Sequence, residues 1–238
     1  MSVKTPKVQA LILDVDGVLL ASPHEQAWRD ALTGLADPAR FTSRLYQDRV
    51  AGRPRADGAL AALEALGVPG PEDRAPDYAA RKQARLESLV RTDGVQAFPD
   101  GLRFVERAAA AGLPMAVASA SRNADAMLKA CPRSDGGSLL DLFRVNLNGR
   151  GEGPGKPDPW IVLRAAAELE TPPQACLVVE DAPAGVRAAR AADALALGVA
   201  RQNDAAALRA AGAHRVVVSL DEVEIEDLAT GLWREPPA

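Results

Sequence analysis

Residues 11–18 of the chain read LILDVDGV, an apolar run that ends in two aspartates separated by one residue. In an extended chain, residues i and i+2 point to the same side, so Asp14 and Asp16 should leave the strand together. Carboxylates this close repel each other unless a cation lies nearby, and a hard divalent ion such as Mg2+ suits oxygen ligands. Gly17 then permits a sharp turn. The stretch therefore indicates a metal-assisted acidic site at a strand end.

Two other interpretations apply to such a pair. Acids that cap a strand or helix end explain an isolated pair equally well, and only the flanking residues separate the two cases. An EF-hand loop also begins with this spacing, but residues 18–20, VLL, provide no further oxygen ligands. The rest of the chain must therefore decide what the pair does.

Apolar runs alternate with alanine-rich amphipathic stretches over most of the remaining sequence. Strands separated by helices predict an α/β fold whose core is a doubly wound, Rossmann-like parallel sheet. The expected strands are Ala10–Leu13, Met115–Ala118, Arg144–Leu147, Cys176–Val179, Leu195–Val199 and Arg215–Val218.

Residues 21–96 break this alternation, because they show helical patterns and no strand signal. They are predicted to form an inserted helical domain, with residues 1–20 and 97–238 forming the core. The expected helices of the insert are Glu25–Leu35, Phe41–Val50, Ala56–Leu66 and Pro76–Val90.

The composition limits the classes of protein to which the chain can belong. With 238 residues, 47% of them hydrophobic and 25% charged, it has the size and balance of a globular domain that carries one smaller module. A net charge of -4 and an aromatic content of 4% disfavour nucleic acid as a partner. The early apolar run is too short for a membrane span, so we expect a cytoplasmic protein without a membrane partner. Cys131 and Cys176 are expected to be buried, reduced thiols.

Acidic and basic residues also lie near other expected strand ends. Glu180 and Asp181 follow one strand, and acids at two strand ends of a parallel sheet can converge on one metal ion. A helix N-cap pair is the commoner explanation when the two are taken alone. Lys156 follows a glycine-rich loop without the Walker pattern, and as a lone residue it would be an ordinary solvated charge.

Ser119 ends another strand, and Ser121 and Asn123 open the helix that follows. A hydroxyl beside helix N-terminal amides suits a phosphate group. A structural N-cap role explains Ser119 and Ser121 equally well.

The combination of these motifs, in this order and each at or near a strand end, resembles the haloacid dehalogenase superfamily. The resemblance covers nearly the whole chain, and the helical insert is similar to the cap domain of that superfamily. It implies an enzyme that transfers phosphoryl groups, in which Asp14 is the nucleophile and becomes an aspartyl-phosphate. Asp16 would then serve as general acid and base.

The same resemblance implies the ligands of the phosphate and of the metal cofactor. Ser119, Ala120 and Lys156 would bind the phosphoryl group. Mg2+ would be held by Asp14, the Asp16 carbonyl and Asp181, with Glu180 in support.

Several residues near the insert resemble β-phosphoglucomutase and its relatives. On that resemblance Arg55 would grip a second phosphate, Lys82 and Asn123 would contact sugar or phosphate oxygens, and His24 would belong to the cap hinge. Ser121 would join this set of substrate-binding residues. Ordinary solvated charges explain Arg55 and Lys82 about as well, and a residue at a helix start explains His24.

The sequence also departs from the mutase pattern. Residues 20–24 form a shorter hinge without its acidic residue, and Gly58 stands where a phosphate-contacting serine is expected. Three functions are therefore compared: a sugar-phosphate mutase, a small-molecule phosphatase, and a binding module without activity. A small phosphorylated metabolite is the expected partner, and the chain is expected to be a monomer or a weak homodimer.

Overall fold

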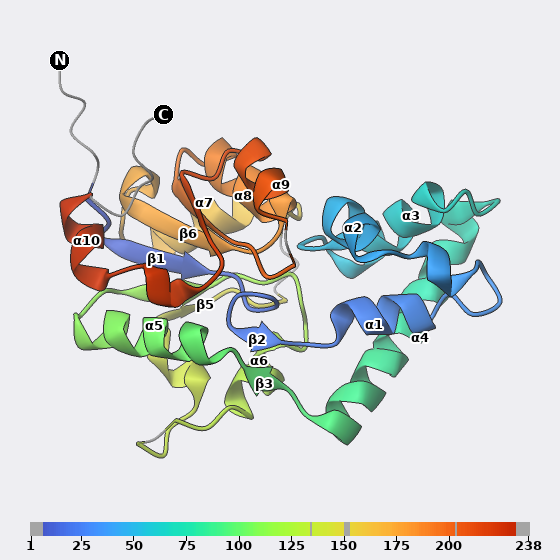
Figure 1. Ribbon diagram of the computed structural model, residues 1–238, viewed down its shortest axis with the longest axis horizontal. Coiled ribbons are helices and arrows are strands. Elements are labelled where there is room, and N and C mark those ends of the chain that lie inside the picture. Colours follow the sequence, from blue (N-terminus) through green and yellow to red (C-terminus); the bar gives the residue numbers. More distant parts are fainter. Residues whose placement is uncertain (1–6, 134, 150–152, 203, 232–238) are drawn as a thin grey trace.

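Six parallel strands form the central sheet of the computed structural model, which describes residues 7–133, 135–149, 153–202 and 204–231 (Figure 1). The strand order is β5-β4-β1-β6-β7-β8. The strands are β1 (Ala10–Leu13), β4 (Met115–Val117), β5 (Val145–Asn146), β6 (Cys176–Glu180), β7 (Leu195–Val199) and β8 (Arg215–Val217). The predicted doubly wound parallel sheet is confirmed, and no strand end differs from its predicted position by more than about one residue.

Alternate side chains of β1 enter two separate hydrophobic layers. Leu11 and Leu13 pack on one face, and Ala10 and Ile12 on the other. The first face is covered by α5 (Pro99–Ala110), α6 (Ala124–Lys129) and α10 (Ile225–Thr230), with the 3-10 turns Leu139–Leu142 and Leu220–Glu222. The second is covered by α7 (Trp160–Glu168), α8 (Pro183–Ala191) and α9 (Ala205–Ala210), and the 3-10 turn Pro173–Ala175 precedes β6.

Burial on both faces fixes the register of β1. Each fully buried Leu or Ile side chain contributes about 1.5–3 kcal/mol, and a slip of one residue would exchange the two faces. This register places Asp14 directly after the strand, at the edge where ligands bind in open parallel sheets.

The chain leaves the sheet through β2 (Leu20–Ala21) and returns through β3 (Gln96–Ala97), which pair antiparallel. The sequence predicts no strand at either place, because two residues are too short to show an alternating pattern. The pairing joins the two connections to the helical insert side by side. It supports the boundaries that we assign to the cap, residues 21–96, which remain a prediction.

The helical insert lies to one side of the sheet in Figure 1 and has its own hydrophobic cluster, which includes Trp28, Leu63 and Tyr78. Its elements are α1 (His24–Asp30), η1 (Pro38–Arg40), α2 (Ser43–Leu45), η2 (Tyr46–Val50), α3 (Arg55–Ala65) and α4 (Pro71–Asp93). The predicted inserted helical domain is therefore confirmed as a structural element of this fold.

Three of the four helices predicted for the insert have wrong boundaries. The helix expected over residues 25–35 ends at Asp30, and the one expected over residues 41–50 is a short α-turn followed by a π-turn. Helix α4 begins five residues earlier than predicted, with Pro71 at its first turn and Pro76 inside it. Pro71 suits a helix start because its missing N–H has no helical partner there, and the packed helix tolerates the bond lost at Pro76.

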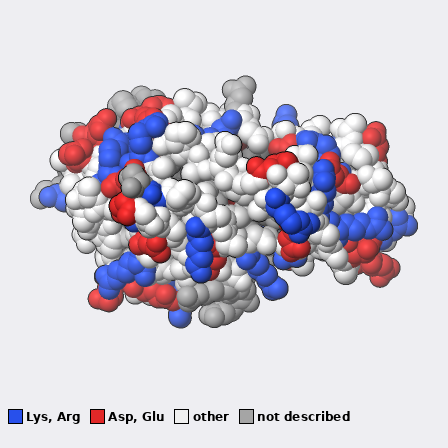
Figure 2. All heavy atoms as spheres, turned by 90° about the horizontal axis from the view of Figure 1, so that it is seen from below, with Lys and Arg blue, Asp and Glu red and all other residues white. Residues whose placement is uncertain are grey.

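The surface and the cysteines agree with a globular protein. Cys131 and Cys176 are buried and unpaired, as predicted. Among the described residues, no helix combines the length and the apolar composition that a membrane crossing requires. On the face shown in Figure 2, basic and acidic side chains are interspersed in small groups. The cytoplasmic location, the absence of a nucleic-acid partner and the oligomeric state stay predictions.

Candidate active site

Asp14 occupies the centre of the sheet edge, between the ends of β4 and β6. Its backbone N–H donates to the Val179 carbonyl at 3.0 Å, and the Ala118 N–H donates to the Leu13 carbonyl at 2.9 Å. The two neighbouring strands thus hold the residue that follows β1 in place. The Asp14 side chain is buried, and burial raises its pKa despite the opposing charge of Lys156.

Lys156 brings a positive charge into this buried position. Its Nζ donates to Asp14 Oδ1 at 2.6 Å and to the Ala118 carbonyl at 3.0 Å, and it lies 2.5 Å from Glu180 Oε1. Burial alone would lower the pKa of Lys156, but Asp14 and Glu180 outweigh this effect and raise it. Lys156 is therefore a fixed ammonium group and not the solvated charge that a lone loop lysine would be.

Three carboxylates gather beside this ammonium. Asp14, Glu180 and Asp181 each offer an oxygen, and these oxygens lie within 4.8 Å of one another. Burial raises the pKa of Asp181, and Asp14 and Glu180 raise it further. Glu180 Oε2 is buried and has no hydrogen-bond partner among the described residues. A cluster of this kind needs more positive charge than one lysine supplies, and its oxygen ligands fit Mg2+.

Two glycines leave room for the acidic side chains. Gly17 has a φ of +83°, and a Cβ on it would lie 1.9 Å from Asp181 Oδ2. A Cβ on Gly185 would lie 2.0 Å from the Glu180 carboxyl carbon. Both positions require glycine, the first for its backbone conformation as well.

Asp16 turns away from the carboxylate cluster and towards the cap. Its Oδ1 accepts a hydrogen bond from Ser22 Oγ at 2.5 Å and lies 3.5 Å from His24 Nε2. Burial raises the pKa of Asp16, and the hydrogen bond from Ser22 opposes this effect. The two aspartates therefore face different partners: Asp14 faces Lys156, and Asp16 faces the hinge residues Ser22 and His24.

Lys82 of α4 connects this hinge to the body of the cap. Its Nζ lies 2.8 Å from His24 Nδ1 and 5.0 Å from the centre of the Trp28 ring. Burial lowers the pKa of Lys82 to about 7, and Arg55 contributes to this shift while Asp16 opposes it. Burial, with the charges of Lys82 and Arg55, also lowers the pKa of His24, so His24 is neutral near pH 7.

The serine-rich segment after β4 is folded into tight turns. The Ser121 N–H donates to Ser119 Oγ at 3.1 Å, and the Asn123 N–H donates to Ser121 Oγ at 3.3 Å. Both amides thus have side-chain partners in the turns before α6, but neither serine is the N-cap of that helix, which is Asn123 and makes no side-chain capping hydrogen bond. The Asn123 side chain exchanges two hydrogen bonds with Gln83 of α4, at 3.0 and 3.3 Å, which joins the cap to the core.

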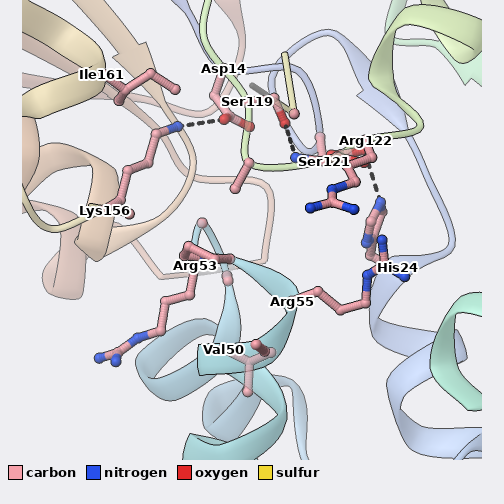
Figure 3. Close-up of a pocket in the computed structure, with 18 of the residues that line it drawn as sticks. Asp14, His24, Val50, Arg53, Arg55, Ser119, Ser121, Arg122, Lys156 and Ile161 are labelled. Carbon is pink, nitrogen blue, oxygen red and sulfur yellow. Dashed lines mark hydrogen bonds and ion pairs between the residues drawn. The ribbon is translucent and has the colours of Figure 1, made fainter. Parts of the chain in front are cut away.

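A cavity of about 390 Å³ lies between the cap and the sheet edge. Its lining includes Asp14, Asp16, Ser119, Ser121, Asn123, Lys156 and Asp181 from the core and His24, Arg55, Lys82 and Gln83 from the cap, whereas Glu180 and Ser22 do not line it. Figure 3 shows Lys156 and Asp14 on one side of this space and Arg55, Arg122 and His24 on the other. Burial lowers the pKa of Arg55, and the like charge of Arg122 lowers it further. Ala120 also lines the cavity.

Comparison with known proteins gives the family. Residues 8–193 match the model of the haloacid dehalogenase-like hydrolases. The chain belongs to this family. It is 34% identical to a β-phosphoglucomutase of Mycobacterium bovis, over 91% of this chain and 92% of that protein. It is also 30% identical to a phosphorylated carbohydrates phosphatase of Thermotoga maritima, over 88% of this chain and 94% of that protein.

Solved structures place the haloacid dehalogenase-like chain in the β-phosphoglucomutase branch. The archaeal β-phosphoglucomutase of Pyrococcus sp. strain ST 04 has a TM-score of 0.74 and 28% identity, and the match covers 94% of this chain and 98% of that one. The chain is therefore an enzyme of the phosphomutase or phosphatase type.

The structure also adds residues to this haloacid dehalogenase site that no sequence motif assigns to it. Arg122 and Gln83 line the main cavity, and Ser22 holds Asp16. Arg122 stands between Ser121 and Asn123, two candidate substrate-binding residues, so its place in the sequence indicated that it could belong to the site. Tyr46, which lines the cavity from the cap, had no such indication, because an aromatic residue in a helical pattern usually belongs to a core.

Proposed function

We propose that the chain is a Mg2+-dependent phosphomutase for phosphorylated sugars that works through an aspartyl-phosphate on Asp14. The observation that carries this proposal is the pair of Arg55 and Arg122, which face the cavity from the cap and the core, away from Lys156. A cavity with cationic groups on both sides suits a sugar with a phosphate at each end. The similarity to β-phosphoglucomutases supports this interpretation.

The first half of the reaction forms the phosphoenzyme. A carboxylate oxygen of Asp14 attacks phosphorus, the P–O bond to the sugar breaks, and the leaving oxygen takes a proton from Asp16. The raised pKa of Asp16 favours the protonated carboxyl that this step requires. Lys156 favours the ionised form of Asp14 and, with Ser119 and Ala120, would hold the phosphoryl oxygens.

The second half returns the phosphoryl group to the other end of the sugar. A sugar hydroxyl attacks the phosphorus of the aspartyl-phosphate, the P–O bond to Asp14 breaks, and Asp16 accepts the hydroxyl proton. Between the two halves the bisphosphate must turn round without leaving. Arg55 and Arg122 would hold the phosphate that is not reacting, and Ser121 and Asn123 would contact the sugar at the rim.

Lys82 and His24 would couple the position of the cap to the acid-base group. His24 of α1 lies against Asp16, and Lys82 of α4 contacts His24, so both contacts depend on the cap lying against the core. In this arrangement Asp16 is correctly placed when a substrate is enclosed, and water is kept out.

We propose Mg2+ as the cofactor, held by Asp14, Asp181 and the Asp16 carbonyl, with Glu180 in support. The cluster of three carboxylates and the unpartnered Glu180 oxygen fit a divalent cation. When bound, such an ion would neutralise charge on the phosphoryl oxygens.

The test is to supply β-glucose 1-phosphate with a trace of the 1,6-bisphosphate and to measure glucose 6-phosphate and free phosphate together. We expect isomerisation to exceed phosphate release. Arg55→Ala should lower isomerisation about tenfold or more, since a charge-assisted hydrogen bond contributes roughly 1.5–3 kcal/mol. Arg49→Ala, which removes an exposed cap arginine that does not line the cavity, is the matched control.

A phosphatase is the second candidate, and the environment of Gly58 favours it. This residue leaves α3 without a hydroxyl one turn after Arg55, and a Cβ there would meet Val50 at 3.2 Å and Trp28 at 3.4 Å. Gly58 is buried and does not line the cavity, so position 58 offers a turning bisphosphate no polar contact of the kind that the mutase pattern implies. Free phosphate without isomerised sugar, at a rate unaffected by Arg55→Ala, would establish the phosphatase instead.

A further inference from the structure

A second cavity, of about 240 Å³, lies at the hinge between the cap and the core. We call it the hinge cavity. It shares three lining residues with the main cavity, namely Asp16, Tyr46 and Asp181. The acidic cluster is therefore bordered by two separate spaces, and a substrate would fill only one of them.

The lining of the hinge cavity is acidic. Asp16, Glu25 and Asp181 contribute carboxylates, and the basic residue of the lining, Arg201, already has partners. Its guanidinium donates to both oxygens of Asp100, at 2.8 and 3.1 Å, and to two backbone carbonyls of the loop after Asp16. Glu25 is paired with Arg29, but no described Lys or Arg lies within ion-pair distance of Asp16 or Asp181. Carboxylates of this kind attract cations and raise their local concentration.

A buried acceptor also points to a hydrated ligand in this space. Gln47 lines the hinge cavity and is 6% exposed, and its Oε1 has no hydrogen-bond partner among the described residues. Buried polar atoms are nearly always paired with protein groups or with ordered water. A donor that enters the cavity, such as a water molecule carried by a cation, would satisfy this oxygen.

The mouth of the cavity lies between the two domains. Gln202, an exposed residue in the loop after β7, donates to Glu25 Oε2 of α1 at 3.4 Å. Because Glu25 also accepts hydrogen bonds from Ser43 and Arg29, its carboxylate is held in place at this border. A passage here would remain in contact with the acidic cluster while the cap is closed.

We propose that the hinge cavity is a separate entrance through which a hydrated divalent cation reaches the cluster of Asp14, Glu180 and Asp181. The proposal rests on the metal dependence proposed above. A sugar phosphate enclosed in the main cavity covers the cluster from that side, so the cation is exchanged through the hinge while the substrate stays bound. Glu25 and Gln47 guide the cation, and Gln202 borders the opening.

The experiment measures metal exchange directly, with Mn2+ as the probe. The rate of release is read by mixing the Mn2+-loaded protein with a fluorescent chelator, and the dissociation constant by titration of the free-ion electron paramagnetic resonance signal. The test variant is Gln202→Trp, which places a bulky side chain at the mouth. Gln174→Trp is the matched control, since Gln174 is exposed just before β6, at the opposite edge of the sheet.

Obstruction of a passage slows entry and exit equally. With inorganic phosphate filling the main cavity, we expect Gln202→Trp to slow both the association and the release of Mn2+ about fivefold or more with an unchanged dissociation constant, and Gln174→Trp to have no effect. Without phosphate the slowing should be smaller, because the main cavity then offers a second route. Unchanged rates in Gln202→Trp, or a weaker affinity with unchanged association, would overturn the entrance. Failure of the wild-type protein to bind Mn2+ would instead refute the metal dependence itself.

Discussion

Replacement of Lys156 by methionine would remove the ammonium group that lies between Asp14 and Glu180 while keeping most of the side-chain volume. Lys156 is 4% exposed and Glu180 1%, so water cannot replace the lost charge without opening the site. Removal of one partner from a buried ion pair typically costs about 3–5 kcal/mol, because the remaining charge is left uncompensated. We therefore expect the free energy of unfolding to fall by about that amount near pH 7.5.

The deficit of Lys156→Met should shrink as the pH is lowered. Burial raises the pKa of Glu180 to about 7, above its unfolded value of 4.5, and loss of Lys156 removes an interaction that opposes this rise. A group whose pKa is raised in the folded state binds its proton there first, so it stabilises the fold at low pH and loses this effect as the pH rises through about 7. The variant should thus approach wild-type stability near pH 5.5.

Urea unfolding in EDTA, followed by circular dichroism, checks both expectations. With a slope of about 3 kcal/mol per molar urea, the midpoint should fall by at least about 1 M near pH 7.5. Lys129→Met, at an exposed position on α6, is the matched control and should not shift the midpoint. A variant that is as stable as the wild type at both pH values would refute the idea that Lys156 compensates the buried carboxylates.

Three further substitutions test the site. Asp14→Asn should abolish phosphoryl transfer without lowering the melting temperature, and turnover above a few per cent of wild type would remove Asp14 from the mechanism. Asp16→Ala should lower turnover by about 10²–10⁴-fold but keep Mn2+ affinity, because the Asp16 carboxylate lies outside the cluster of Asp14, Glu180 and Asp181. A loss of Mn2+ affinity as large as that in Asp14→Asn would contradict the acid-base role of Asp16. Gly17→Ala should weaken Mn2+ binding about tenfold or more by displacing Asp181. Gly34→Ala is the control, because Gly34 has a similar φ of +81° but open space around it, and it should leave Mn2+ binding unchanged. Equal effects of the two substitutions would show that backbone strain alone is responsible.

The sheet and the core motifs could be predicted from the sequence because both are local. A buried parallel strand appears as an uninterrupted apolar run, and Asp14 and Glu180 stand at the points where two such runs end. The parallel topology then brings distant strand ends together. The pairing of β2 with β3 could not be predicted, because two residues carry no periodic signal.

Other parts of the site depend on contacts between distant residues. Arg201 pairs with Asp100, 101 positions away, and its guanidinium lies 4.1 Å from the centre of the Phe98 ring, next to the return from the cap. Neither residue belongs to a motif, so nothing in the sequence connects them. The start of α4 was misplaced for a different reason: a proline is usually a boundary, and here the tertiary packing of Tyr78 and Leu86 maintains a helix that includes Pro76.

The separate hydrophobic cluster of the cap has a consequence for the divergence of related enzymes. Its buried side chains, from Trp28 to Tyr78, come only from the insert, whereas the strand ends that carry Asp14 and Asp181 rest on the two layers of the sheet. Mutations that repack the insert can therefore accumulate in a lineage without disturbing the packing beneath Asp14 and Asp181. Selection for a new metabolite can then act on one hydrophobic core while the other stays unchanged.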